Sequence, residues 1–136
     1  MIEKIDHVAI AVKDLDQAVK IFEQALGLEV KTVETFEEVK MRICFIPVGE
    51  VLLELLEDTD PGGMISQFIS EKGEGLHHIA YRVTNVEKTL EHLKKSGLKL
   101  RNEKPIQGGA GAQIAFVERE STNNVLTEIV ERKEDR

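Results

Sequence analysis

The chain has 136 residues and a formal net charge of −7, and hydrophobic residues make up 41% of it. A chain of this length can bury a core of its own, whereas its negative charge is opposite to the basic footprint that nonspecific nucleic-acid binding requires. No run of residues is apolar enough for a membrane span, and the single cysteine, Cys44, excludes an intrachain disulfide. We therefore expect a cytoplasmic protein that has no nucleic-acid or membrane partner.

The first half of the chain is predicted to contain a strand, a helix and three further strands. An apolar, β-rich run covers residues 3–12. Asp14 is a good N-cap for the apolar residues of helical spacing that follow, and Gly27 is a natural C-terminal stop for that helix. The three later strands are expected at about 28–35, 39–47 and 50–57.

The second half of the chain repeats the first. Residues 76–83 align with residues 5–12 at an offset of 71 positions, and residues 125–131 align with residues 51–57 at an offset of 74 positions. Because both ends of the unit recur in the same order, we interpret the chain as an internal duplication.

The second copy has the same predicted elements as the first. Asn85 takes the place of the first N-cap and Gly97 ends the helix, while residues 61–72 form an amphipathic connecting helix between the copies. The strands after the second helix are expected at about 98–103, 112–118 and 124–131. We predict one α+β domain over residues 1–136, in which two tandem β-α-β-β-β modules, at about 3–58 and 74–131, form a curved mixed sheet around a metal site.

Strand alternation predicts that four chemically active side chains face one another. His7 and His78 occupy matching positions of the two modules, on faces shared with alanine residues. Glu54 and Glu128 also match, and each lies between apolar neighbours, where a carboxylate is costly unless it is paired or bound to a metal. These four side chains therefore predict one divalent metal site that leaves two positions of an octahedral ion to substrate. His77 faces the other way and is expected to be structural or to support the site.

The duplicated module with its His and Glu residues resembles the vicinal oxygen chelate superfamily, which has a glyoxalase-like fold. Within it, the sequence is similar to the methylmalonyl-CoA epimerases over essentially the whole chain. The segments that carry the resemblance are residues 5–18, 48–57, 73–83 and 125–133, together with the glycine-rich residues 104–112.

The resemblance implies a set of ligands, a metal and a substrate. His7, His78 and Glu128 are the expected metal ligands, and Glu54 stands where the family has Gln or Glu. The expected ion is Co²⁺, with Mn²⁺, Zn²⁺ or Ni²⁺ as alternatives. Members of the epimerase family interconvert (R)- and (S)-methylmalonyl-CoA by moving the C2 proton through a metal-stabilised enolate. A homodimer that takes an acyl-CoA substrate is therefore expected.

Inversion at C2 is simplest with two bases, of which the sequence assigns one. Glu128 is the catalytic base candidate, since it is also an expected ligand. Some members have a second glutamate on the strand where this chain has Ile43, which is a departure from the family pattern. A water, Glu50, Glu120 or a mobile Glu128 remain as alternatives for the second base.

The residues that bind the CoA phosphates are not assigned by the sequence. Two pairs of cationic residues are candidates for this role, and they are Lys40 with Arg42 and Arg101 with Lys104. Two other functions also stay open. One is a glyoxalase-type lyase acting on a thiol-conjugated 2-oxoaldehyde, and the other is a metal-free protein of the same fold that binds or sequesters a ligand.

Overall fold

The computed structural model describes residues 1–133, and the chain divides into two compact units. The N-terminal unit is His7–His77, and the C-terminal unit combines Met1–Asp6 with the chain from His78 onward. Strand β1 (Ile2–Ala11) therefore contributes its first residues to one unit and its last residues to the other. None of the helices in the described part of the chain is long and apolar enough to cross a membrane.

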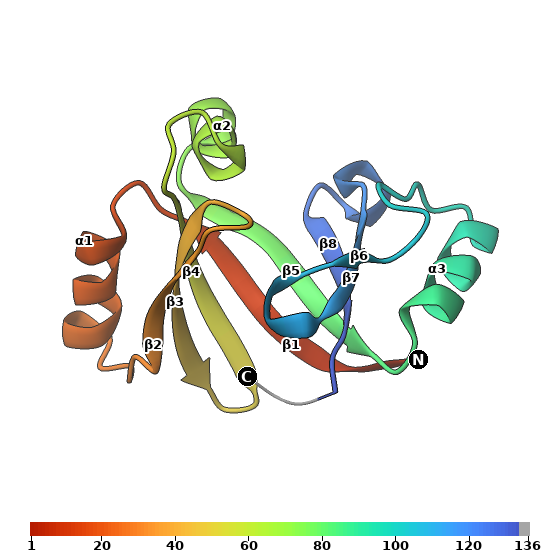
Figure 1. The fold of residues 1–136 in the computed structure, drawn as a ribbon, viewed down its shortest axis with the longest axis horizontal. Coiled ribbons are helices and arrows are strands. Elements are labelled where there is room, and N and C mark those ends of the chain that lie inside the picture. Colours follow the sequence, from red (N-terminus) through yellow and green to blue (C-terminus); the bar gives the residue numbers. More distant parts are fainter. Residues whose placement is uncertain (134–136) are drawn as a thin grey trace. The chain divides into compact units, whose positions relative to one another are not determined.

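The elements follow the predicted order in both halves of the chain (Figure 1). In the first half they are β1 (Ile2–Ala11), α1 (Leu15–Lys20) with a π-helical turn over Ile21–Ala25, β2 (Thr32–Phe36), β3 (Met41–Val48), β4 (Val51–Asp58) and α2 (Met64–Lys72). In the second half they are β5 (Gly75–Val83), α3 (Val86–Lys95), β6 (Ile106–Gln107), β7 (Gln113–Val117) and β8 (Leu126–Glu131). The predicted α+β fold of two tandem β-α-β-β-β modules is confirmed.

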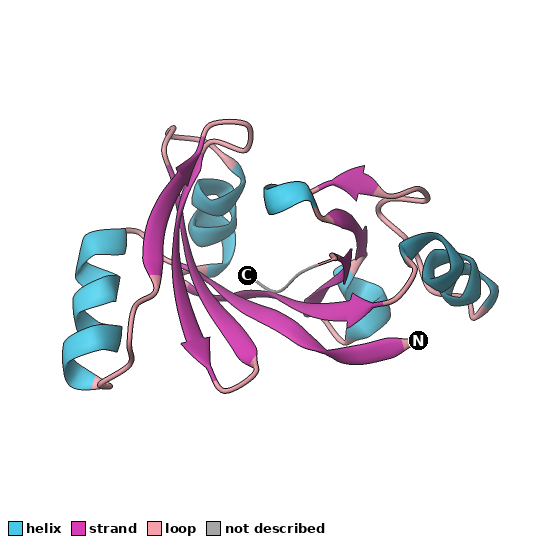
Figure 2. Ribbon diagram, turned by 60° about the horizontal axis from the view of Figure 1, so that its bottom comes forward, coloured by secondary structure: helices cyan, strands magenta, loops and turns pink. Residues whose placement is uncertain are grey.

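The N-terminal unit is a mixed sheet with a helix on each side. Its strand order is β2-β3-β4-β1, in which β1 is parallel to β4 and the other pairs are antiparallel. Figure 2 shows α1 and α2 on the two sides of these strands. Helix α1 covers a core that contains Leu15, Cys44 and Leu55, and Ile65 of α2 packs with Ala9 and Leu56 on the other face.

The C-terminal unit repeats this arrangement with one change. Its strand order is β5-β8-β7-β6, and β5 is parallel to β8. Helix α3 covers one face, where Val86 and Leu90 are buried. On the other face Ala112, which follows the glycine-rich loop, packs against Ala80 and Val130. A loop residue thus contacts the face that α2 covers in the other unit.

The N-terminus of the helix in each module, α1 and α3, is stabilised by the same two kinds of hydrogen bond. A polar residue just before the helix accepts a hydrogen bond from the third helical N–H, as predicted, and a glutamate at the end of the last strand accepts one from the first. The four acceptors are Asp14 (from Gln17, 3.1 Å), Asn85 (from Lys88, 2.9 Å), Glu57 (from Leu15, 2.8 Å) and Glu131 (from Val86, 2.9 Å). The repeated Glu-x-x-Glu pattern of the last strands thus has a structural second member in each module.

Removing one N-cap provides a direct test of this arrangement. Asn85→Ala is expected to lower the free energy of unfolding by about 1 kcal/mol, because the Lys88 N–H loses its acceptor. Asn85→Asp, which keeps an acceptor oxygen at the same place, is expected to unfold at the wild-type denaturant midpoint. Urea titration followed by circular dichroism measures both variants, and an Asn85→Ala midpoint equal to the wild type would contradict the capping role.

The strand predicted at 98–103 is wrong. Over these residues the structure has a single bridge, between Leu100 and Val117, and β6 forms later, at Ile106–Gln107. Backbone bonds still join this segment to its neighbour, from the Arg101 N–H to the Phe116 carbonyl at 2.8 Å and from the Glu118 N–H to the Lys99 carbonyl at 2.9 Å. Side chains accept two further bonds, Ser121 Oγ from the Lys99 N–H at 2.9 Å and Asn102 Oδ1 from the Phe116 N–H at 2.9 Å. Hydrogen bonds of this kind compete with a regular ladder.

Candidate active site

The N-terminal unit contains one buried His–Glu pair, formed by β1 and β4. Ala9 lies opposite Glu54 in the parallel register, and His7 Nδ1 is 3.5 Å from Glu54 Oε2. The residues are only 4% and 7% exposed. On its other side Glu54 has Phe45 of β3 as its register partner. The carboxylate therefore lies between two apolar residues of the neighbouring strands, and the histidine lies within ion-pair distance.

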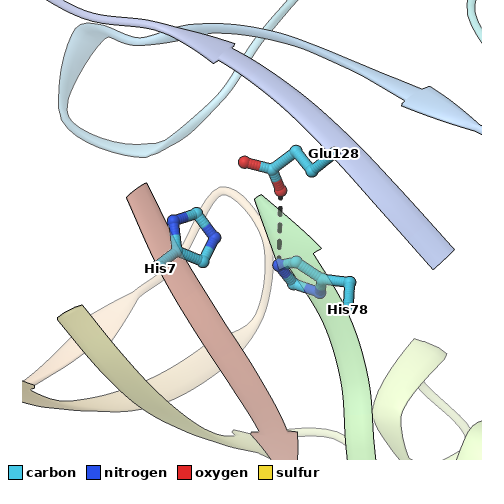
Figure 3. Close-up of side chains that lie close together, drawn as sticks. All are labelled: His7, His78 and Glu128. Atoms are coloured by element: carbon cyan, nitrogen blue, oxygen red, sulfur yellow. Dashed lines mark ion pairs between the residues drawn. The ribbon is translucent and has the colours of Figure 1, made fainter. Parts of the chain in front are cut away.

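The C-terminal unit contains the matching pair, formed by β5 and β8. Ala80 is the register partner of Glu128, and His78 Nε2 is 3.4 Å from Glu128 Oε1 (Figure 3). Phe116 of β7 lies on the other side of Glu128, and the His78 ring meets the Phe116 ring at 90° with centroids 5.9 Å apart. The alanine, the glutamate, the histidine and the phenylalanine all recur at repeat-equivalent positions of the two units.

The nitrogen–oxygen distances in both pairs are longer than strong hydrogen bonds, and only the His78–Glu128 distance falls within the separation of two ligands of one ion. Charge-assisted N–H···O bonds are typically about 2.7–2.9 Å long, and both pairs exceed this range. Two atoms that bind one ion at about 2.1 Å lie about 3.0–3.4 Å apart, depending on the coordination angle. With neutral imidazoles, the two buried carboxylates carry the charge that a divalent cation balances. Among the described residues, His7, His78 and Glu128 form a group of the kinds of side chain that could hold such an ion, and Glu54 is not part of that group.

The C-terminal unit contains a second charged cluster that was not predicted from the sequence. Arg82 is on the same face of β5 as His78, and Asp6 accepts hydrogen bonds from Arg82 Nε at 2.8 Å and from Arg132 Nη2 at 2.8 Å. The side chains of Asp6 and Arg132 are 3% and 7% exposed. No local sequence pattern links residues so far apart in the chain. The buried carboxylate binds both guanidinium groups and joins the first half of β1 to the ends of β5 and β8.

His77 is a buried side chain in the N-terminal unit, and it packs against helix α2. It is 2% exposed, and its ring meets the Phe68 ring of α2 edge-on, with centroids 4.8 Å apart. This contact supports the structural alternative of the two that the sequence left open for His77.

The two carboxylates considered as second bases lie at exposed positions. Glu50 is in the turn between β3 and β4, and Glu120 lies in a short helical turn where its side chain is 3.4 Å from Lys99 Nζ. The pKa of Glu120 is below its usual value, because its own backbone N–H and then Lys99 stabilise the carboxylate. A lowered pKa makes Glu120 a poorer proton acceptor.

Three of the cationic candidates for CoA recognition already have carboxylate partners. Arg42 bonds to Glu57 at 3.2 Å and to Asp16 at 3.1 Å, so it joins β3, β4 and α1. The other two pairs are Lys40 with Asp60 at 3.3 Å and Arg101 with Glu118 at 2.8 Å. Arg42 is therefore a structural residue of the N-terminal unit, and the phosphate-binding roles stay predictions.

The sequence pattern of the Glyoxalase/Bleomycin resistance protein/Dioxygenase superfamily matches residues 6–116. The chain belongs to this superfamily. Its members include the epimerases, and the ethylmalonyl-CoA/methylmalonyl-CoA epimerase of Cereibacter sphaeroides is 30% identical, over 95% of this chain and 98% of that protein. The uncharacterized protein YqjC of Bacillus subtilis is 37% identical, over 97% of this chain and 94% of that protein.

A solved structure extends this likeness to the fold. A methylmalonyl-CoA epimerase in complex with methylmalonyl-CoA and ammonium superposes with a TM-score of 0.89 at 29% identity, covering 100% of this chain and 99% of that one. The glyoxalase-like fold expected from the resemblance is therefore confirmed.

Proposed function

We propose that this protein is a metal-dependent epimerase that interconverts (R)- and (S)-methylmalonyl-CoA. The observation that carries the proposal is the buried His–Glu pair that recurs at equivalent positions of both units, in a chain similar over nearly its full length to methylmalonyl-CoA epimerases. The related structure was obtained with methylmalonyl-CoA, which supports an acyl-CoA thioester as the substrate class.

In this proposal His7, Glu54, His78 and Glu128 together hold one divalent ion. Co²⁺ is the first expectation and Mn²⁺, Zn²⁺ and Ni²⁺ are the alternatives, since imidazole and carboxylate donors suit all four ions. When bound, the ion supplies a Lewis acid beside the thioester, where negative charge develops as the C2 proton leaves.

The chain's own contribution to catalysis centres on Glu128. The residue is 5% exposed and lies between Ala80 and Phe116, with His78 beside its carboxylate. A positioned carboxylate in such surroundings is suited to accept the C2 proton, because general-base catalysis requires a base held within reach of the substrate. Glu54 has the same setting, and we assign it metal binding alone.

The protein is further proposed to be a homodimer in the cytoplasm. Strand β2 ends the strand order of the N-terminal unit and β6 ends that of the C-terminal unit, and an edge strand is a surface that proteins commonly cover by association. Cys44 is a buried thiol whose pKa is raised by burial, which is compatible with a reducing compartment.

A comparison of substrates tests the proposed reaction against its alternatives. Purified protein with added Co²⁺ is incubated with (S)-methylmalonyl-CoA and, separately, with hemithioacetals of methylglyoxal with glutathione or bacillithiol. The proposal predicts (R)-methylmalonyl-CoA in the first reaction and no hydroxyacyl thioester in the second. Hydroxyacyl thioester formation without epimerisation would show a glyoxalase-type lyase instead, and no turnover of any substrate would favour a ligand-binding protein.

A further inference from the structure

One face of the N-terminal sheet carries both the His7–Glu54 pair and the position where the family resemblance leads us to expect a second base. Directly opposite residues of an antiparallel pair point to the same side of a sheet. In the β3–β4 register Phe45 lies opposite Glu54, and Ile43 lies opposite Leu56. Ile43 thus shares the face of Glu54, and its apolar side chain packs in the cluster that contains Leu56.

The next strand outward carries a carboxylate at the matching place. Glu34 of β2 is the direct register partner of Ile43. The strand alternates, so that Thr32, Glu34 and Phe36 are half-buried while Val33 and Thr35 are exposed. Glu34 therefore belongs to the inward side of β2.

An aromatic contact confirms which face this is. The rings of Phe36 and Phe45 meet edge-on, with centroids 6.1 Å apart. Phe45 is the register partner of Glu54, so Phe36 and, two residues before it, Glu34 stand on the face that carries the His7–Glu54 pair. The other glutamates near β2 differ, because Glu37 and Glu38 lie in the turn after the strand and are exposed.

We infer that Glu34 is the second catalytic carboxylate, supplying from β2 the group that Ile43 lacks. The inference rests on the proposed epimerase function. In one direction the C2–H bond breaks, its electron pair passes into the enolate, and the proton goes to one of the two carboxylates. The other residue, as a carboxylic acid, then donates a proton to the opposite face of C2. The two residues exchange roles in the reverse direction, so no proton is gained or lost overall.

The extra distance to β2 is compatible with this role. Neighbouring strands are about 4.8 Å apart, so Glu34 begins one strand spacing farther from Glu54 than a carboxylate at position 43 would. A general base acts through direct contact or through one intervening water, and one such water lengthens the reach of the carboxylate by about 2.8 Å, more than half of this spacing. At position 43 the apolar isoleucine lies between Glu34 of β2 and Leu56 of β4.

The test compares Glu34→Gln with Glu37→Gln, a matched change at an exposed turn residue. Each variant, loaded with Co²⁺, is assayed for interconversion of the epimers and for exchange of the C2 hydrogen of each epimer in deuterated water. We expect Glu34→Gln to lose epimerisation by about 10²-fold or more, while the C2 hydrogen of one epimer still exchanges with solvent without inversion. Glu37→Gln should behave as the wild type.

A second variant and a rescue keep the inference independent of folding effects. Glu34→Thr, which suits an edge strand, should lose epimerisation as strongly as Glu34→Gln. Ile43→Glu in the Glu34→Gln background returns a carboxylate to the same face and should recover at least tenfold. Epimerisation by Glu34→Gln within threefold of the wild type, or loss of exchange from both epimers, would overturn the inference. A wild-type protein that exchanges neither epimer would instead contradict the proposed function itself.

Discussion

Replacing Glu128 by glutamine will lower the kcat for epimerisation of methylmalonyl-CoA by about 10²–10⁴-fold, the usual contribution of a positioned general base. The amide keeps the shape of the side chain between Ala80 and Phe116, but it cannot accept the C2 proton. The measurement is the initial rate of (R)-methylmalonyl-CoA formation from the (S)-epimer at saturating Co²⁺.

Glu54→Gln is the matched control for this variant. Glu54 occupies the same setting in the other unit, between Ala9 and Phe45, and an amide oxygen can still bind a divalent cation. If Glu54 only binds metal, its glutamine variant will keep kcat within about tenfold once the metal concentration is raised to compensate for a weaker site. Equal losses in the two variants would contradict the division of roles between Glu54 and Glu128.

The second large effect is expected from the His7→Ala/His78→Ala double variant, which should lose the bound metal. The change removes both imidazoles from the proposed four-donor set and leaves two carboxylates to bind the ion alone. We expect one divalent ion per chain in the wild type after dialysis against micromolar Co²⁺, and none in the double variant, measured by elemental analysis.

Two other histidines provide controls for the double variant. His92→Ala changes an exposed residue of α3 and should keep both the metal and the fold. His77→Ala removes a buried ring that packs on Phe68, so it should lower the free energy of unfolding while the metal is retained. A double variant that retains metal at the wild-type ratio, with an unchanged circular dichroism spectrum, would contradict the assignment of His7 and His78 as ligands.

The duplication explains why so much of the fold and of the two His–Glu pairs could be predicted from the sequence. A single histidine on a strand has many structural explanations, but His7 and His78 at matching positions, each with a matching glutamate, have few. The N-caps at Asp14 and Asn85 could also be predicted from the sequence, because a cap depends on residues close in sequence.

The unpredicted features depend on register and on contacts between distant segments. Glu34 acquires its significance only when β2 is aligned with β3, and a shift of one residue would place it on the other face. The buried Asp6 could not be predicted either, because it binds Arg82 and Arg132, which lie far from it in the sequence. The missing strand at 98–103 also involves distant residues, since Asn102 accepts from the Phe116 N–H and Ser121 accepts from the Lys99 N–H.

The central claim is that two repeated His–Glu pairs support metal-dependent proton exchange at C2 of methylmalonyl-CoA. The most direct measurement is the uptake of deuterium at C2 from deuterated water, followed by mass spectrometry with Co²⁺-loaded protein and again after treatment with a chelator. We predict rapid uptake that the chelator abolishes and that added Co²⁺ restores. Uptake that persists at the same rate without metal, or no uptake with metal bound, would contradict this account.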